Sequence, residues 1–223
     1  MKIFAIDTSA VAASCALAED GKIIFEFYTN AGLQHSRTLA PMIESAFKCT
    51  ETSLSDVDCF AVSKGPGSFT GVRIGIAAVK GMAFEGDRPC VGVSTLEAMA
   101  YNLECARGII CPVMDARCNQ VYNALFEFKE GGLSRLCDDR VLTVDELEGE
   151  LKNEKTPVFF VGDGALLCYN RLKDSLFDPR IAPEGQRFQR ASGVIKAAQA
   201  ALFADDVDIV VDVADGGHRL RQV

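Results

Sequence analysis

Two apolar segments of this sequence end on an aspartate, and their repetition constrains the fold more than any other feature. The segment IFAI at residues 3–6 runs into Asp7, and IICPVM at 109–114 runs into Asp115. A short apolar run bounded by polar residues predicts a buried strand. Each strand is followed by two further strand-like stretches and then by helical patterns. The chain therefore reads as two halves of similar layout.

The first half predicts the element order βββαβαβα. Asp20-Gly21 is a strong signal for a two-residue hairpin turn. Ser36 is the predicted N-cap of the first helix, and Ser94 with Glu97 has the pattern of a capping box. The predicted strands are residues 2–9, 13–17, 23–28, 59–63 and 90–93, and the predicted helices are 36–49, 70–84 and 94–105.

The second half repeats the order βββαβα and adds a terminal helix and strand. Gly131-Gly132 predicts its hairpin, Thr143 with Glu146 predicts a capping box, and Ser192 is the predicted cap of the last helix. The predicted strands are residues 109–114, 120–128, 133–142, 157–161 and 207–213, and the predicted helices are 143–153, 165–173 and 192–204.

This repeated order is typical of a duplicated α/β unit. Strand triplets followed by βαβ crossovers form mixed sheets that helices cover. An aspartate at the tip of each first strand is the layout of nucleotide-cleft proteins of the actin and sugar-kinase type. We therefore predict an α/β protein of duplicated actin-like ATPase (ASKHA) fold, with lobes at residues 1–107 and 108–223 that divide at Gly108.

The nucleotide cleft of such a fold is predicted to be vestigial here. The aspartates would hold magnesium, and glycines after them would let backbone N–H groups approach phosphate. In this sequence Thr8 and Ala116 follow the aspartates instead, so a role in ending each strand is favoured over catalysis. The candidate cleft residues are Asp7, Gly65, Gly67, Thr70, Gly71 and Asp115.

The glycine-rich segment at residues 65–71 has two interpretations. It joins a strand to a helix, where free N–H groups and the helix dipole favour an anion. It lacks the G-K-[ST] of a phosphate-binding P-loop. A structural turn with Thr70 as N-cap explains the same residues, and the pattern alone does not decide between the two.

Metal, protease and nucleic-acid functions find little support in the composition. The only histidines are His35 and His218, far apart in sequence, and none of the nine cysteines forms a C-x-x-C pair. We predict no metal site and no cofactor. H-E-x-x-H and G-x-S-x-G are absent, which argues against a protease. The net charge of −8 argues against independent nucleic-acid binding.

The cellular setting is predicted from the same composition. An odd number of cysteines within apolar stretches is typical of a reducing cytoplasm. The N-terminus enters a strand without the pattern of a signal peptide. No uncharged apolar stretch reaches the length of a membrane span. We therefore expect a cytoplasmic protein that does not contact membranes.

A series of motifs resembles one family, the bacterial TsaB (YeaZ) proteins. The most specific is G-P-G-S-F-T-G-V-R-I-G at residues 65–75, followed by a helix of small residues. D-T at 7–8, H-S-R at 35–37, G-V-S-T-L at 92–96 and D-A-R at 115–117 match in order. The resemblance is strong over residues 2–128 and looser beyond. G-H-R-L-R at 217–221 stands where the family has Y-L-R.

The resemblance implies a role in tRNA modification. TsaB is similar to TsaD, the catalytic subunit that makes N6-threonylcarbamoyladenosine at position 37 of tRNAs reading ANN codons, but is regarded as non-catalytic. It implies that this chain is a scaffold or activating subunit that binds a TsaD-type partner, is joined by a TsaE-type ATPase, and forms a homodimer when alone. The alternative is an active small-molecule kinase or ATPase of the same fold.

The resemblance also implies a partner surface on the first two helices of the N-terminal lobe, paired in a four-helix bundle. Small residues on the second helix allow close approach, and apolar residues on both helices offer contacts. The competing interpretation is that these faces pack on the chain's own sheet. Arg73 is expected to contact either the partner or a nucleotide. The candidate interface residues are Leu39, Met42, Ile43, Phe47, Val72, Arg73, Gly75, Ile76, Ala78, Val79 and Met82.

Overall fold

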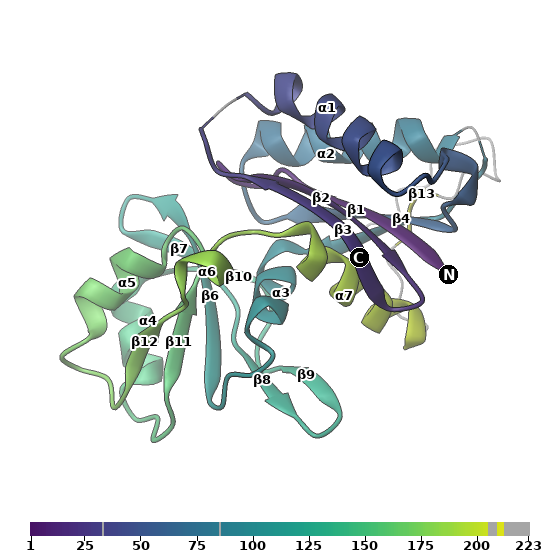
Figure 1. The fold of residues 1–223 in the computed structure, drawn as a ribbon. Helices are drawn as coiled ribbons and strands as arrows, with labels where there is room; N and C mark the ends of the chain where they lie inside the picture. The colour runs from purple at the N-terminus through teal and green to yellow at the C-terminus, as the bar shows by residue number, and fades with distance from the viewer. Residues whose placement is uncertain (33, 85, 205–208, 212–223) are drawn as a thin grey trace. The chain divides into compact units, whose positions relative to one another are not determined.

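The computed structural model describes residues 1–32, 34–84, 86–204 and 209–211. The chain divides into two compact units. Unit 1 contains residues 1–98 together with those from 189 onward, and unit 2 contains residues 99–188. Both units are α/β, as the sequence predicts (Figure 1).

Unit 1 is built on one mixed sheet. Its six strands lie in the order β13 (Ile209–Val211), β5 (Cys90–Ser94), β4 (Cys59–Gly65), β1 (Lys2–Asp7), β2 (Ala13–Glu19) and β3 (Lys22–Thr29). The pairs β1–β4 and β4–β5 are parallel, while β1–β2, β2–β3 and β13–β5 are antiparallel. The antiparallel triplet followed by parallel crossovers is the predicted topology.

Helices cover both faces of this sheet. Figure 1 shows α1 (His35–Cys49) and α2 (Phe69–Phe84) on one side and α7 (Ala191–Phe203) on the other. Phe4 and Ile6 of β1 pack with buried side chains of α1 and α2 in one apolar cluster. Because both faces are covered, every residue of β1 except Lys2 is buried.

The structure confirms some of the turns and helix caps that the sequence predicts. Asp20 and Gly21 both have positive φ, 49° and 85°, as the hairpin between β2 and β3 requires. Ser94 caps α3 (Thr95–Ala100), because its Oγ accepts the Glu97 N–H at 3.3 Å. A 3₁₀ turn, η2 (Tyr101–Leu103), follows α3, so that helix ends before the predicted residue 105.

Two predicted caps of unit 1 are wrong. Gln34, not Ser36, precedes α1, and it makes no capping bond with its side chain. Helix α2 begins at Phe69, and Ser68 Oγ accepts the Gly71 N–H at 3.3 Å. Ser68 therefore holds the capping position that the sequence assigns to Thr70, because its hydroxyl lies three residues before that N–H group.

Unit 2 repeats the arrangement around one long strand, β6, with six short strands. The strands are β6 (Ile109–Arg117), β7 (Gln120–Asn123), β8 (Phe126–Lys129), β9 (Gly132–Arg135), β10 (Arg140–Thr143), β11 (Val158–Val161) and β12 (Pro179–Ile181). Their order is β10-β7-β6-β11-β12, with β8 paired to β6 and β9. Residues of α4 (Val144–Leu151) and α5 (Ala165–Leu172) form an apolar cluster with β6 and β11. A single turn, α6 (Glu184–Arg187), follows β12.

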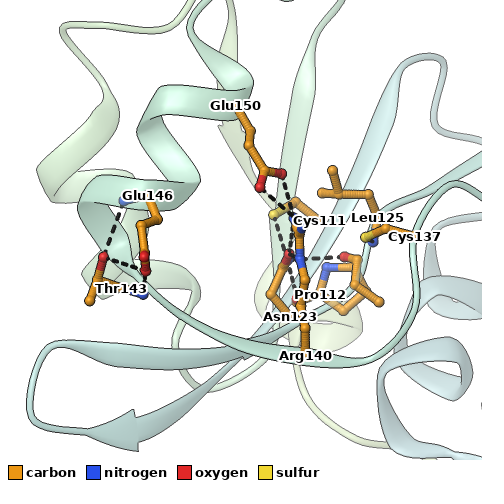
Figure 2. A network of polar contacts seen from close by, with 10 residues as sticks. Cys111, Pro112, Asn123, Leu125, Cys137, Arg140, Thr143, Glu146 and Glu150 are labelled. Carbon is orange, nitrogen blue, oxygen red and sulfur yellow. Dashed lines mark hydrogen bonds and ion pairs between the residues drawn. The ribbon is translucent and has the colours of Figure 1, made fainter.

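The predicted strands 120–128 and 133–142 are each broken in two, and Figure 2 shows the polar contacts at the break. Pro112 of β6 has no N–H group to donate to a neighbouring strand. The buried Asn123 amide donates to Pro112 O at 3.0 Å and to Cys111 Sγ at 3.3 Å. The Leu125 N–H then donates to Cys137 Sγ at 3.2 Å. Side chains thus replace the ladder where pairing passes from β7 to β8.

The last helix belongs to unit 1, which differs from the predicted lobe at 108–223. Helix α7 begins at Ala191, and Ser192 does not cap it with its own side chain. Instead Ser192 donates from its N–H and Oγ to Glu26 of β3, at 3.0 and 2.7 Å. The Arg190 guanidinium donates to the same carboxylate at 2.8 Å. These long-range bonds fix α7 on the first sheet, and no local pattern encodes them.

Candidate functional site

Asp7, at the end of β1, is held entirely by its own chain. Its side chain has no exposed surface. Ser9 donates to Oδ1 from its N–H at 2.9 Å and from its Oγ at 2.7 Å. Ser63 Oγ of β4 donates to Oδ2. Burial raises the pKa of Asp7 above its ordinary value, and the bonds from Ser63 and Ser9 partly oppose that rise.

The glycine-rich segment packs directly on the turn after Asp7. A Cβ on Gly71 would lie 2.0 Å from Thr8 O, and one on Gly67 would lie 2.4 Å from Ser9 O. Ser68 donates its N–H to Ser9 O at 2.6 Å, and Thr8 Oγ1 donates to Gly71 O at 2.7 Å. The chain's own backbone thus occupies the space beside these glycines. This contact explains why both positions are glycine, and a bound phosphate is not needed to explain it.

Gly65 and Thr70, the other two cleft candidates of this segment, take no part in that contact. Gly65 has a φ of 119° and open space where a Cβ would point. Thr70 is exposed in the first turn of α2. Asp7, Gly67 and Gly71 are therefore brought together, while Gly65 and Thr70 lie outside their packing.

Asp115 lies in unit 2 in a different environment. It is exposed, and its Oδ1 accepts the Arg117 N–H at 2.7 Å. The hairpin turn that follows holds three consecutive non-glycine residues, 117–119, at φ of 68°, 51° and 60°. Asp163 lies between β11 and α5. Desolvation of its carboxyl group raises its pKa, and the nearby Asp115 charge adds to the rise.

The described part of the chain offers no evident metal centre. Within residues 1–32, 34–84, 86–204 and 209–211, no group of three or more His, Cys, Asp or Glu side chains is placed to hold an ion. His35, in the first turn of α1, donates from Nε2 to Ala10 O at 2.7 Å. His218 and the rest of the 217–221 motif lie outside the described residues.

None of the helices in that same part of the chain combines the length and the apolar character that crossing a membrane requires.

Four of the candidate interface residues are buried within unit 1. Leu39, Met42 and Val79 belong to its apolar core, and Val79 is only 1% exposed. A Cβ on Gly75 would lie 2.7 Å from Thr8 Oγ1 and 3.2 Å from Val62 Cγ2, so this glycine serves close packing on the chain's own sheet. These four face the sheet, as the competing interpretation predicts.

The other candidates lie nearer the surface. Ile43, Phe47, Ile76, Ala78 and Met82 are partly buried against the same core. Phe47 stacks on Phe4 with ring centroids 5.0 Å apart. Val72 is half-buried and Arg73 is exposed.

An exposed stripe on α2 is largely missed by sequence reasoning. It consists of Phe69, Arg73, Ala77, Gly81 and Phe84, which recur at helical spacing on the outer face and are named here the outer stripe. Phe69 and Phe84 are 70% and 75% exposed. The Arg73 guanidinium lies 3.7 Å from the centroid of the Phe69 ring. The available signal is the four-residue repeat of 69, 73, 77 and 81, opposite the buried repeat of 71, 75, 79 and 83.

Comparison with known proteins is consistent across sequence and structure. Residues 29–214 match the family model for TsaD, tRNA N6-adenosine threonylcarbamoyltransferase. The chain is 37% identical to the tRNA threonylcarbamoyladenosine biosynthesis protein TsaB of Bacillus subtilis over 177 residues, which cover 79% of this chain and 77% of that protein. A crystal structure of a Pseudomonas aeruginosa protein with similarity to the peptidase YeaZ superposes with a TM-score of 0.76 and 25% identity, covering 96% of each chain.

More distant structures share the fold alone. The activator of 2-hydroxyisocaproyl-CoA dehydratase from Clostridium difficile, solved with bound ADPNP, matches with a TM-score of 0.51 at 11% identity over the whole of both chains. Together with the two mixed sheets, these likenesses confirm the predicted actin-like ATPase fold. By sequence and by structure, the chain belongs to the TsaB (YeaZ) family.

Proposed function

We propose that this chain is the non-catalytic TsaB-type subunit of the machinery that makes N6-threonylcarbamoyladenosine in tRNA. It binds and activates a TsaD-type catalytic subunit, and a TsaE-type ATPase joins the assembly. The observation that carries this proposal is the state of Asp7, whose two carboxylate oxygens accept bonds from Ser9 and Ser63 of the same chain while fully buried. A carboxylate so engaged is poorly placed to hold magnesium.

The outer stripe is the surface that we assign to the catalytic subunit. Exposed aromatic rings stand at its two ends, and Ala77 and Gly81 leave the middle shallow, so a partner helix approaches α2 closely. Burying an exposed Phe side chain contributes about 1.5–3 kcal/mol. The same stripe joins two copies of the chain when the catalytic subunit is absent. The net charge of −8 leaves tRNA binding to the partner.

The outer stripe is tested with Ala77→Arg, which places a long charged side chain in its middle. The residue is exposed, so the chain should fold normally. We expect the complex with a TsaD-type subunit to be lost in size-exclusion chromatography. Ala200→Arg on α7, another exposed helical alanine, is the matched control and should leave the complex intact.

Two outcomes would contradict the proposal. Intact complex formation by the Ala77→Arg variant would show that the outer stripe is not the partner surface. Turnover of ATP by the isolated wild-type chain with magnesium, lost in Asp7→Asn, would show that the cleft is catalytic and would favour the kinase or ATPase alternative.

A further inference from the structure

A hollow in unit 1 is lined by none of the cleft residues and by none of the outer-stripe residues. Its volume is about 370 Å³, at the lower end of the range for small-molecule sites. It lies between the 3₁₀ turn η1 (Leu54–Asp56) and the C-terminal end of α2. Its lining residues are Ser53, Leu54, Ser55, Met82, Gly86 and Arg88.

Arg88 gives this hollow its chemical character. Its Nη2 donates to Ser55 O at 2.9 Å, but its buried Nε has no hydrogen-bond partner among the residues that the structure describes. A buried donor without a partner costs about 1–3 kcal/mol. Within the described residues no acidic side chain forms an ion pair with Arg88. Among the described residues, which leave out Glu85, Arg88 therefore lines the hollow as a cation without an ion-pair partner.

Gly86 leaves the space that the Arg88 side chain occupies. A Cβ at Gly86 would lie 2.9 Å from Arg88 Nε and 3.4 Å from its Cγ. The φ of Gly86 lies outside the left-handed region, so its identity is explained by this space rather than by backbone conformation. The side chain at 88 is thus packed over a residue that leaves room for it.

The remaining lining selects among anions. Leu54 and Met82 add apolar surface, which suits a short hydrocarbon chain. Asp56, on the same turn, accepts bonds from the N–H and Oγ of Ser53, at 2.8 and 2.7 Å. Its negative charge close to the hollow disfavours a doubly charged phosphate more than a singly charged carboxylate.

We propose that this hollow binds a small monocarboxylate, with the carboxylate on Arg88 and a short apolar chain against Leu54 and Met82. A carboxylate accepts N–H bonds from a guanidinium in the geometry that Arg favours. This site shares no lining residue with the outer stripe, and the inference does not depend on the proposed function.

The test is an NMR titration of the full chain labelled with ¹³C at its methionine methyl groups. The chain has five methionines, and Met82→Leu identifies the Met82 signal by its absence. Butyrate is the probe, and butyramide and propyl phosphate are its neutral and dianionic analogues. We expect saturable movement of the Met82 signal with butyrate, at least about tenfold weaker binding of propyl phosphate, and none of butyramide.

Two variants separate the guanidinium from a general charge effect. Arg88→Gln removes the charge, and Gly86→Ala keeps it but displaces Nε. Each should weaken butyrate binding about tenfold or more, while Arg37→Gln, at an exposed position of α1, should not. Thermal unfolding checks that each variant is folded. The absence of a saturable Met82 shift with butyrate, equal binding by Arg88→Gln, or tighter binding of propyl phosphate would overturn the proposal.

Discussion

The two halves of the chain have the same strand order but differ in how each sheet is completed. The order β3-β2-β1-β4-β5 of unit 1 corresponds to β10-β7-β6-β11-β12 of unit 2. In unit 1 the pairing of β1 with β2 runs unbroken from Lys2 to Asp7. In unit 2 the antiparallel pairing of β6 passes from β8, at Ile109 and Ile110, to β7, from Val113 onward, and the Asn123 amide donates to Pro112 O between them. In unit 2, a side-chain hydrogen bond from Asn123 thus completes the sheet at a position where strand pairing is interrupted.

In both halves, glycines pack closely against backbone of the first strand or of the turn that follows it. In unit 1, Gly67 and Gly71 press on the Thr8–Ser9 backbone. In unit 2, a Cβ on Gly162 would lie 2.2 Å from Val113 O, and one on Gly164 would lie 3.1 Å from the same atom. Yet Asp7 is buried and bonded, while Asp115 is exposed. The glycines thus maintain the fold in both halves, whereas the aspartates have diverged.

The largest effect is expected from Gly71→Ala, because its Cβ meets Thr8 O at 2.0 Å with no flexible side chain to yield. We expect a loss of about 3 kcal/mol or more in the free energy of unfolding, measured by urea denaturation. Gly162→Ala should cost as much through Val113 O in unit 2. Gly81→Ala, in open space on the same helix as Gly71, should be neutral or stabilising by up to about 1 kcal/mol. A mild Gly71→Ala would refute the shared contact.

The next effect concerns the broken strand. Asn123→Ala removes the donor to Pro112 O and the acceptor of the Arg140 guanidinium, whose Nη2 lies 3.2 Å from Asn123 Oδ1. We expect a loss of about 2–3 kcal/mol, because buried partners are left unpaired. Asn170→Ala, at an exposed position of α5, should change stability by less than about 0.5 kcal/mol. Equal effects from both variants would mean that side chains do not complete the second sheet.

A smaller effect distinguishes the first helices of the two halves. Thr143 caps α4, since its Oγ1 accepts the Glu146 N–H at 3.2 Å, whereas Gln34 makes no capping bond to α1. Thr143→Ala should therefore cost about 1 kcal/mol and Gln34→Ala almost nothing, by thermal or urea unfolding. A comparable loss at Gln34 would show that α1 depends on a side-chain cap after all.

The smallest effect is expected from Asp7→Asn, and it depends on pH. Asparagine still accepts the Ser9 bonds, so we expect a cost within about 1 kcal/mol at acidic pH. Because the folded pKa of Asp7 is raised, the native state binds its proton more tightly than the unfolded state. Wild-type stability is therefore lost as pH rises through that folded pKa. The difference from the uncharged variant should shrink as pH rises, and a difference that widens would contradict the raised pKa.

The sequence predicts best what is locally encoded. The Asp20-Gly21 hairpin and the Thr143–Glu146 capping box are both confirmed, because each depends on residues within four positions. Docking of α7 depends on Glu26, which is 166 residues from Ser192, and no local pattern carries that information. The inner and outer faces of α2 are hard to separate in the sequence because both contain small residues. The contacts of Gly71 and Gly75 with Thr8 and the burial of Val79 identify the inner one.

The most direct test of the proposed non-catalytic role uses Asp7→Asn in an assembled complex with TsaD-type and TsaE-type subunits and tRNA. The rate of threonylcarbamoyladenosine formation is measured beside complex formation by size-exclusion chromatography. If Asp7 serves only the fold of this subunit, the rate stays within about twofold of wild type. A fall of about 100-fold or more, of the size seen when a catalytic group is removed, in a complex that still assembles, would contradict a non-catalytic role.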